Sequence, residues 1–178
     1  TSNMVSSGLR ECIRYLAEHK LVDAIVTTAG GVEEDIIKTM KPFLLGDFRA
    51  DGAKLRQAGI NRTGNIFVPN NRYIEFEKFF QPVLKELLEN QRKTGKIISP
   101  SEIIDLFGKK VKSRESIYYW TYKNKIPVFC PAMMDGAIGD NVYFFNFDKN
   151  QELKIDMAKD HHKLIELVMG ADETGIII

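Results

Sequence analysis

Residues 22–35 read VDAIVTTAGGVEED, and this stretch decides the fold that the rest of the chain supports. Its apolar run at residues 24–26 predicts a short strand that is buried on both faces. The two glycines that follow predict a tight turn that a ligand can approach, because neither has a side chain. Three acids then occupy what we expect to be the first turn of a helix that Pro42 ends. A strand, a glycine turn and a helix in this order form a common ligand site in open α/β sheets.

The three acids decide which ligand this turn favours. Amides at a helix N-terminus attract anions, but carboxylates beside them repel a second phosphate group. The turn therefore favours a cationic ligand, or a nucleotide whose phosphates lie elsewhere. Its two adjacent glycines do not match the G-x-G-x-x-G fingerprint of dinucleotide sites. A buried strand followed by a helix whose acids only favour its own dipole explains the pattern equally well.

A second stretch with chemical character follows another short apolar run. Residues 127–131 are bounded by prolines and predict a second buried strand, which leads to DGAIGD at residues 135–140. Asp135 and Asp140 would lie beyond the carboxyl end of that strand. Neighbouring parallel strands end at one edge of a sheet, so both aspartates would join the acids of residues 33–35 at one mouth. A solvated loop of ordinary turn residues explains the two aspartates equally well.

Helical periodicity predicts most of the remaining structure. We expect five further helices, from Ser6 or Ser7 to about Leu21, Asn71 to about Arg92, Ser99 to Gly108, Ser116 to Asn124 and about Gln151 to Met169. Pro82 should kink or divide the second of these helices. The last helix should turn its apolar residues inward, namely Leu153, Met157, Leu164, Ile165 and Val168. We also expect a long irregular excursion at residues 43–71, an extended piece at residues 143–147 and a strand that begins at residues 176–178. Alternating strands and helices indicate an α/β fold with a parallel sheet.

Composition limits the kinds of function. The chain has 178 residues, 44% of them hydrophobic and 28% charged, which is enough apolar material for one core. Its formal charge of +1 is too small to attract nucleic acid or an anionic membrane electrostatically. No apolar run approaches the roughly 20 residues that a membrane-spanning helix needs. Cys12 and Cys130 have no metal-ligand spacing, so we expect no metal site and two reduced core cysteines in a cytoplasmic protein. We place His19 and the pair His161 and His162 on the surface.

The two ends of the sequence predict that the chain is part of a longer one. It begins at Thr1 rather than at a methionine, and it ends in three isoleucines. A natural domain seldom ends in a bare β-branched run, because that strand would be left as an exposed sheet edge.

Several motifs together resemble deoxyhypusine synthase. They are TSNMVSSG at residues 1–8, TTAGGVEED at 27–35, GINRTGN at 59–65, VPN at 68–70, ESIYYW at 115–120, IPVF at 126–129 and DGAIGD at 135–140. The resemblance covers essentially the whole chain, which corresponds to the middle part of the family's length. It implies that residues 1–178 form one NAD- and spermidine-binding domain, truncated at both ends. It also implies a Rossmann-like α/β fold, with helices on both faces of a mostly parallel sheet, in a homotetramer of paired subunits with active sites between subunits.

The resemblance also implies a reaction and its ligands. NAD takes a hydride from spermidine, and the aminobutyl group passes through an imine on an enzyme lysine to a lysine of the precursor of translation initiation factor 5A. By motif position, the implied NAD contacts are Ser2, Asn3, Met4, Val5, Ser6, Thr28, Ala29, Gly30, Glu34 and Asp135. The implied spermidine contacts are Glu33, Glu34 and Asp140. Spaced carboxylates suit a polyamine because charge-assisted hydrogen bonds fix the register of its spaced ammonium groups.

The nucleophilic lysine that the resemblance implies lies beyond Ile178, so we expect no catalytic residue among these 178 residues. Lys38, Lys41 and Lys54 lie outside the matching motif. We therefore expect these residues alone not to complete catalysis. Two alternatives stay open: a homospermidine synthase, which uses putrescine as the acceptor, and an inactive paralogue that regulates an active subunit. The retained acids and the turn at residues 28–30 favour an intact ligand site.

Overall fold

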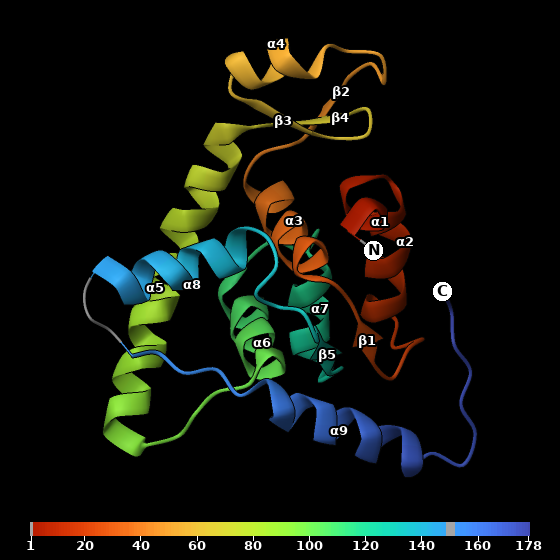
Figure 1. Cartoon of the computed structure of the whole chain (residues 1–178). Helices are drawn as coiled ribbons and strands as arrows, with labels where there is room; N and C mark the ends of the chain where they lie inside the picture. Colours follow the sequence, from red (N-terminus) through yellow and green to blue (C-terminus); the bar gives the residue numbers. More distant parts are fainter. Residues whose placement is uncertain (1, 149–151) are drawn as a thin grey trace.

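The structure is a computed structural model, and it describes residues 2–148 and 152–178. Most of these residues are helical, and a small lobe stands apart from a larger body (Figure 1). The elements are α1 (Ser2–Ser6), α2 (Leu9–Glu18), β1 (Ile25–Val26), α3 (Ala29–Met40), β2 (Leu44–Leu45), α4 (Gly52–Gln57), β3 (Ile60–Thr63), β4 (Ile66–Pro69), α5 (Asn70–Thr94), α6 (Pro100–Lys110), α7 (Ile117–Asn124), β5 (Val128–Phe129), α8 (Ala137–Asp148) and α9 (Met157–Met169).

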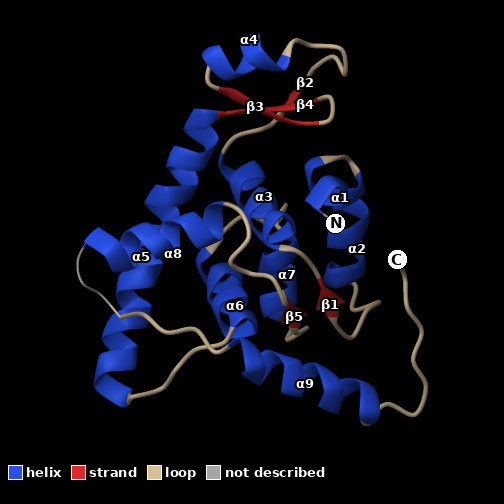
Figure 2. Cartoon of the chain, in the orientation of Figure 1, coloured by secondary structure: helices blue, strands red, loops and turns tan. Residues whose placement is uncertain are grey.

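The two strands predicted at residues 24–26 and 127–131 pair in parallel, which confirms the α/β class. β1 aligns Ile25 with Val128 and Val26 with Phe129. Figure 2 shows this short sheet surrounded by helices. Both strands end at the same edge, so α3 and the loop before α8 start side by side. The expectation that β1 is buried on both faces is wrong in this chain, because Val26 is 58% exposed.

α3 is the centre of the body. It contacts α1, α5, α7 and α8, and its residues Val32, Ile36 and Ile37 are fully buried. Its partners in the core include Phe76 and Phe80 of α5, together with residues of α6 and α7. Burial of this apolar face holds α3 in place and so fixes where its polar residues point.

The start of α3 corrects the predicted glycine turn. Thr28 caps the helix, since its side chain accepts a hydrogen bond from the Gly31 amide at 3.3 Å. Both glycines are therefore helical, and the acids of residues 33–35 lie in the second turn rather than the first. Gly30 is needed for helix packing, because a Cβ atom there would lie 2.7 Å from Cβ of Ser2 in α1.

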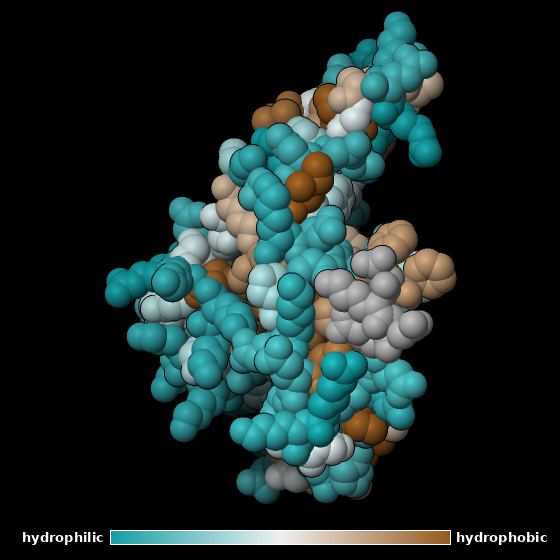
Figure 3. Space-filling view, turned by 90° about the vertical axis from the view of Figure 1, so that its left-hand side faces the viewer, coloured by the Kyte–Doolittle hydropathy of each residue, from teal (hydrophilic) through white to brown (hydrophobic). Residues whose placement is uncertain are grey.

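Residues 43–71, which we expected to be irregular, contain a folded lobe. Strands β2, β4 and β3 form an antiparallel sheet in that order, and α4 packs beside β3. Arg62 joins the sheet to the preceding loop by donating to the carbonyl oxygens of Ala50 and Phe48. The strands have only two to four residues, so the sequence showed no clear alternation. Figure 3 shows the lobe projecting from the body, with a largely hydrophilic surface on this side.

The long helix predicted from Asn71 to Arg92 is confirmed as α5, within two residues at each end. It begins directly after Pro69 and ends before Gly95, whose φ of 72° is the left-handed conformation that glycine tolerates. Pro82 lies inside the helix and does not divide it. The aromatic stripe of α5 faces the core, as the spacing predicted.

The last third of the chain differs from three predictions. Residues 143–147 are helical within α8 and not extended, although their aromatic side chains favour strands. The final helix begins at Met157, where Asp156 caps it by accepting the Lys159 amide at 3.0 Å. Gln151, the predicted start, lies outside the described residues. Residues 176–178 form no strand and are exposed.

Burial of individual side chains also departs from expectation in places. Ile165 and Val168 of α9 are each 49% exposed rather than inward. Cys130 is buried as predicted, whereas Cys12 is exposed because it lies on the outer face of α2. The three histidines are exposed, as expected. In the part of the chain that the structure describes, none of the helices has both the length and the apolar character needed to cross a membrane.

Candidate functional site

Glu33 links α3 to the start of α8. Its Oε2 atom accepts a hydrogen bond from the Ile138 amide at 3.1 Å, and the residue is only 7% exposed. Gly136 packs against the same carboxylate with a φ of 75°, and a Cβ atom there would lie 2.8 Å from Oε1 of Glu33. Only glycine accommodates both that backbone conformation and the close carboxylate. The predicted meeting of residues 33–35 with residues 135–140 is therefore confirmed for Glu33.

A cavity of about 480 Å³ opens beside Glu33, between α5, α8 and β3. Its acidic members are Glu33, Glu77 and Asp140, and no basic side chain is among its lining residues in the described part of the chain. The lining consists of Glu33, Asn61, Tyr73, Ile74, Glu77, Gln81, Gly136, Ala137, Asp140, Asn141 and Phe144. A cavity with three carboxylates and two aromatic rings suits an extended organic cation.

The electrostatics of this cavity follow from burial and like charge. Burial raises the pKa of Glu33 from its ordinary 4.5 to about 7, the Ile138 amide lowers it, and Glu34 and Asp140 raise it further. Burial, with the charges of Glu33 and Glu34, raises the pKa of Tyr73 to about 12. Burial is the larger cause of both shifts, and the neighbouring carboxylates add to it. A bound cation would lower the pKa of Glu33 and so return the carboxyl to its ionised form.

Glu34 faces a different neighbourhood, on the side of α1. It is 8% exposed, and burial raises its pKa to about 7 while the Ser6 hydroxyl and the Lys38 ammonium lower it. Its buried Oε2 atom has no hydrogen-bond partner among the described residues. Buried acceptors normally have donors, so this atom is suited to a hydroxyl group of a ligand. Glu34 does not line the 480 Å³ cavity.

The other residues implied to contact NAD fall into one group and one outlier. α1 packs against α3, so Ser2, Asn3, Met4, Val5 and Ser6 lie near Thr28, Ala29 and Gly30. Lys38 fixes this packing, because its Nζ atom donates to the carbonyl oxygens of Val5 at 3.0 Å, Ser6 at 3.1 Å and Ser7 at 3.3 Å. Asp135 is exposed and is not among the described residues that line the cavity.

The third acid of α3 is structural, so the predicted gathering of five carboxylates is wrong. Asp35 is fully buried and accepts from Arg10 Nε at 2.7 Å, the Ser116 hydroxyl at 2.6 Å and the Ile117 amide at 3.1 Å. These bonds tie α2, α3 and α7 together. Of the five acids, only Glu33 and Asp140 share the cavity.

The sequence analysis missed the residues that α5 and β3 contribute, namely Asn61, Tyr73 and Glu77. Tyr73, Glu77 and Gln81 recur at intervals of four, which places them on one face of a helix. That spacing was available in the sequence. The wide apolar stripe of α5 predicts a core helix, and that stronger signal gave no reason to assign a function to the polar face.

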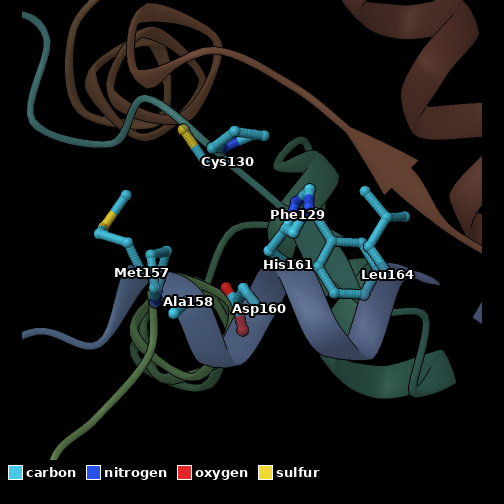
Figure 4. A pocket seen from close by; sticks show the side chains of 9 residues that line it. Phe129, Cys130, Met157, Ala158, Asp160, His161 and Leu164 are labelled. Carbon is cyan, nitrogen blue, oxygen red and sulfur yellow. The ribbon is translucent and has the colours of Figure 1, made fainter. Parts of the chain in front are cut away.

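A second cavity of about 330 Å³ lies where β5 and the loop after it meet α9 (Figure 4). Cys130 is unsuited to nucleophilic chemistry there, because burial raises the pKa of its thiol to about 12. The Asp160 carboxylate already accepts hydrogen bonds from the Ser101 amide at 2.5 Å and the Ser101 hydroxyl at 2.6 Å. The acidic cavity beside Glu33 is therefore the stronger candidate site.

The fold and the site define a class: an α/β protein with an acidic cleft beside a capped helix N-terminus, at the carboxyl edge of a parallel strand pair. The family model described as deoxyhypusine synthase matches residues 1–178. The chain belongs to the deoxyhypusine synthase family.

Individual relatives agree with this family. A Methanocaldococcus jannaschii protein named "Probable deoxyhypusine synthase" is 57% identical over 186 residues, covering 100% of this chain and 56% of that protein. A Candida glabrata protein named "Deoxyhypusine synthase" is 45% identical over 195 residues, covering 100% of this chain and 51% of that protein. A crystal structure of a candidate deoxyhypusine synthase from Entamoeba histolytica matches with a TM-score of 0.81 and 29% identity, covering 99% of this chain and 54% of that one. The chain thus spans about half the length of these relatives.

Proposed function

We propose that this chain forms the NAD- and spermidine-binding part of a deoxyhypusine synthase. The enzyme would transfer the aminobutyl group of spermidine to a lysine of the precursor of translation initiation factor 5A, which is the first step of hypusine formation. The observation that carries the proposal is the position of Glu33, a buried carboxylate that shares an acidic cavity with Asp140 in a member of this family.

Glu33 and Asp140 are proposed to hold spermidine. An ammonium group close to Glu33 would lower the pKa of its carboxyl from about 7, so the pair would become fully charged. The resulting carboxylate can then accept a proton from the reacting ammonium group, which frees the nitrogen lone pair as the neighbouring carbon loses hydride. Transfer of the aminobutyl group leaves 1,3-diaminopropane.

The proposed NAD site consists of Ser2, Asn3, Met4, Val5, Ser6, Thr28, Ala29, Gly30, Glu34 and Asp135. Two observations indicate that these residues can accommodate NAD. The unpartnered Oε2 atom of Glu34 suits a ribose hydroxyl, a role that acids have in dinucleotide sites. The acids lie in the second turn of α3, so the amides of its first turn can face a phosphate without a carboxylate beside them. When bound, NAD supplies the acceptor for the hydride.

We also propose the wider setting that accompanies this activity. The protein would act in the cytoplasm on the precursor of a translation factor. It would assemble as a homotetramer, a dimer of dimers with its active sites between subunits, and would bind neither nucleic acid nor membrane. The chain has 25 basic and 24 acidic residues, so its net positive charge is small. This supports the proposal that it binds neither nucleic acid nor an anionic membrane, because both are attracted by an excess of positive charge.

The test measures transfer from labelled spermidine to the factor precursor, using the protein as its gene encodes it, with NAD. We expect Asp140→Asn to raise KM for spermidine at least tenfold and the control Glu75→Gln, which is not among the described residues lining the cavity, to leave it unchanged. Unaltered kinetics in Asp140→Asn would contradict the assignment of this cavity. Preferential transfer to putrescine would indicate a homospermidine synthase, and ligand binding without turnover would indicate an inactive paralogue.

A further inference from the structure

The outer part of the acidic cavity has a regular construction. α5 contributes Tyr73, Glu77 and Gln81, and the wall they form is about 12 Å long at about 1.5 Å per residue. α8 contributes the facing wall, with residues at intervals of three or four from Ala137 to Phe144. The walls are joined where Gln81 Nε2 donates to Oδ1 of Asn141 at 3.3 Å. The cavity is therefore an elongated groove between two helices.

Three carboxylates lie along this groove at different depths. Glu33 is buried, whereas Asp140 and Glu77 are exposed at the mouth. Glu77 has no ion pair or hydrogen bond within the described residues. Glu75, two positions earlier on the same helix, pairs with Lys78 at 3.0 Å and with Lys41 at 3.9 Å and is not among the described residues that line the groove. Glu77 is thus a carboxylate that none of the described residues neutralises.

Phe144 lies on the opposite wall and is 61% exposed. An exposed ring beside an unpaired carboxylate suits a flexible alkyl ammonium, whose methylenes pack on the ring and whose charge interacts with its face. A hydrated metal ion has no methylenes to pack on the ring. The combination therefore selects an organic cation of some length.

We propose that Glu77 is a further specificity-determining residue, which binds the third ammonium group of a triamine whose other two ammonium groups are held by Glu33 and Asp140. The inference rests on the proposed function and assigns one carboxylate to each charge of spermidine. A diamine held by Glu33 and Asp140 has no third ammonium group for Glu77. The groove thereby distinguishes a triamine from a diamine at its mouth.

The expected effect is on affinity. Glu77 is exposed, so its pairing with an ammonium is partly screened by water and weakens as salt is added. We expect Glu77→Gln to raise KM and Kd for spermidine about fivefold to tenfold at low ionic strength and to change kcat less than twofold. The difference from the wild type should shrink with added salt.

The test compares two ligands and two variants in the protein as its gene encodes it. Calorimetric titrations measure Kd for spermidine and for 1,4-diaminobutane with the wild type, with Glu77→Gln and with the control Glu75→Gln. We expect weaker binding only for spermidine with Glu77→Gln. Equal weakening of both ligands, equal effects of both variants, or no effect of Glu77→Gln would overturn the inference while wild-type binding of spermidine stands. A wild-type protein that does not bind spermidine would instead contradict the proposed function and this inference together.

Discussion

Replacement of Glu33 by glutamine should change how the stability of the protein depends on pH. Glutamine keeps the shape of the side chain and an oxygen that can accept the Ile138 amide bond of 3.1 Å, so the link between α3 and α8 is retained. The substitution removes only the titration. Its effect can therefore be assigned to the buried charge rather than to lost packing.

The magnitude follows from the pKa of Glu33, which rises from 4.5 to about 7 on folding. A folded-state pKa above the unfolded value means that the folded protein binds the proton more tightly. This stabilisation is fully present below about pH 4.5 and is lost as the pH rises through about 7. A difference of about 2.5 at about 1.4 kcal/mol per pKa unit gives about 3 kcal/mol. Glu34, also at about 7, contributes a separate change of the same sign.

Urea denaturation at several pH values between 5 and 8 measures this directly. We expect the free energy of unfolding of the wild type to fall across this range, and Glu33→Gln to remove about 2.5 kcal/mol of the fall. Glu75→Gln is the matched control, because Glu75 is paired with Lys78 at the surface and has a lowered pKa. A variant Glu33→Gln with the full wild-type pH dependence would refute the assignment of a buried carboxyl that titrates near neutrality.

Three further changes test the packing around the site. Asp35→Asn removes the buried counter-charge of the Arg10 guanidinium and leaves only the exposed Glu11 carboxylate at 3.4 Å, so it should lower the free energy of unfolding by about 3 kcal/mol. Gly108→Ala should cost about 1 to 3 kcal/mol or more, because a Cβ atom there would overlap the Tyr118 carbonyl oxygen where α6 meets α7. Lys38→Met removes three hydrogen bonds to carbonyl oxygens near the end of α1, so amide hydrogen exchange in α1 should accelerate and Kd for NAD should rise severalfold.

Each of these changes has a control elsewhere in the chain. Glu75→Gln breaks an exposed ion pair and should cost less than about 1 kcal/mol. Gly52→Ala adds a methyl group with no atom within 4 Å and should be nearly neutral. Lys41→Met removes a half-buried lysine that, among the described residues, donates no hydrogen bond to α1. If a control and its test variant behave alike, the specific contact is not the cause.

Part of the fold could be predicted because its signals were strong and local. The apolar runs at β1 and β5 predicted a parallel pair, and the apolar stripe of α5 predicted a long helix to within two residues at each end. The meeting of Glu33 with the loop before α8 followed from the rule that parallel strands end at one edge. These inferences needed no knowledge of distant contacts.

The errors arose where distant contacts decide local structure. The two glycines predict a turn, but Thr28 caps a helix that includes them, and the contact with Ser2 of α1 leaves no room for a side chain at Gly30. Residues 143–147 were expected to be extended, but Glu33 accepts an amide in the first turn of α8 and so favours an early helix start. Asp35 could not be separated from its two neighbours until Arg10 and Ser116 were seen to surround it.

The central claim is that Glu33 lies in the cavity that receives a polyamine, and proton release on binding tests it most directly. At pH 7 a carboxyl group whose pKa is about 7 is half protonated, and a bound ammonium group should drive that proton off. Titration of spermidine in two buffers of different ionisation enthalpy should show release of about half a proton per site in the wild type. The release should be absent in Glu33→Gln. Spermidine binding with no proton release in the wild type, or with the same release in both proteins, would contradict the account.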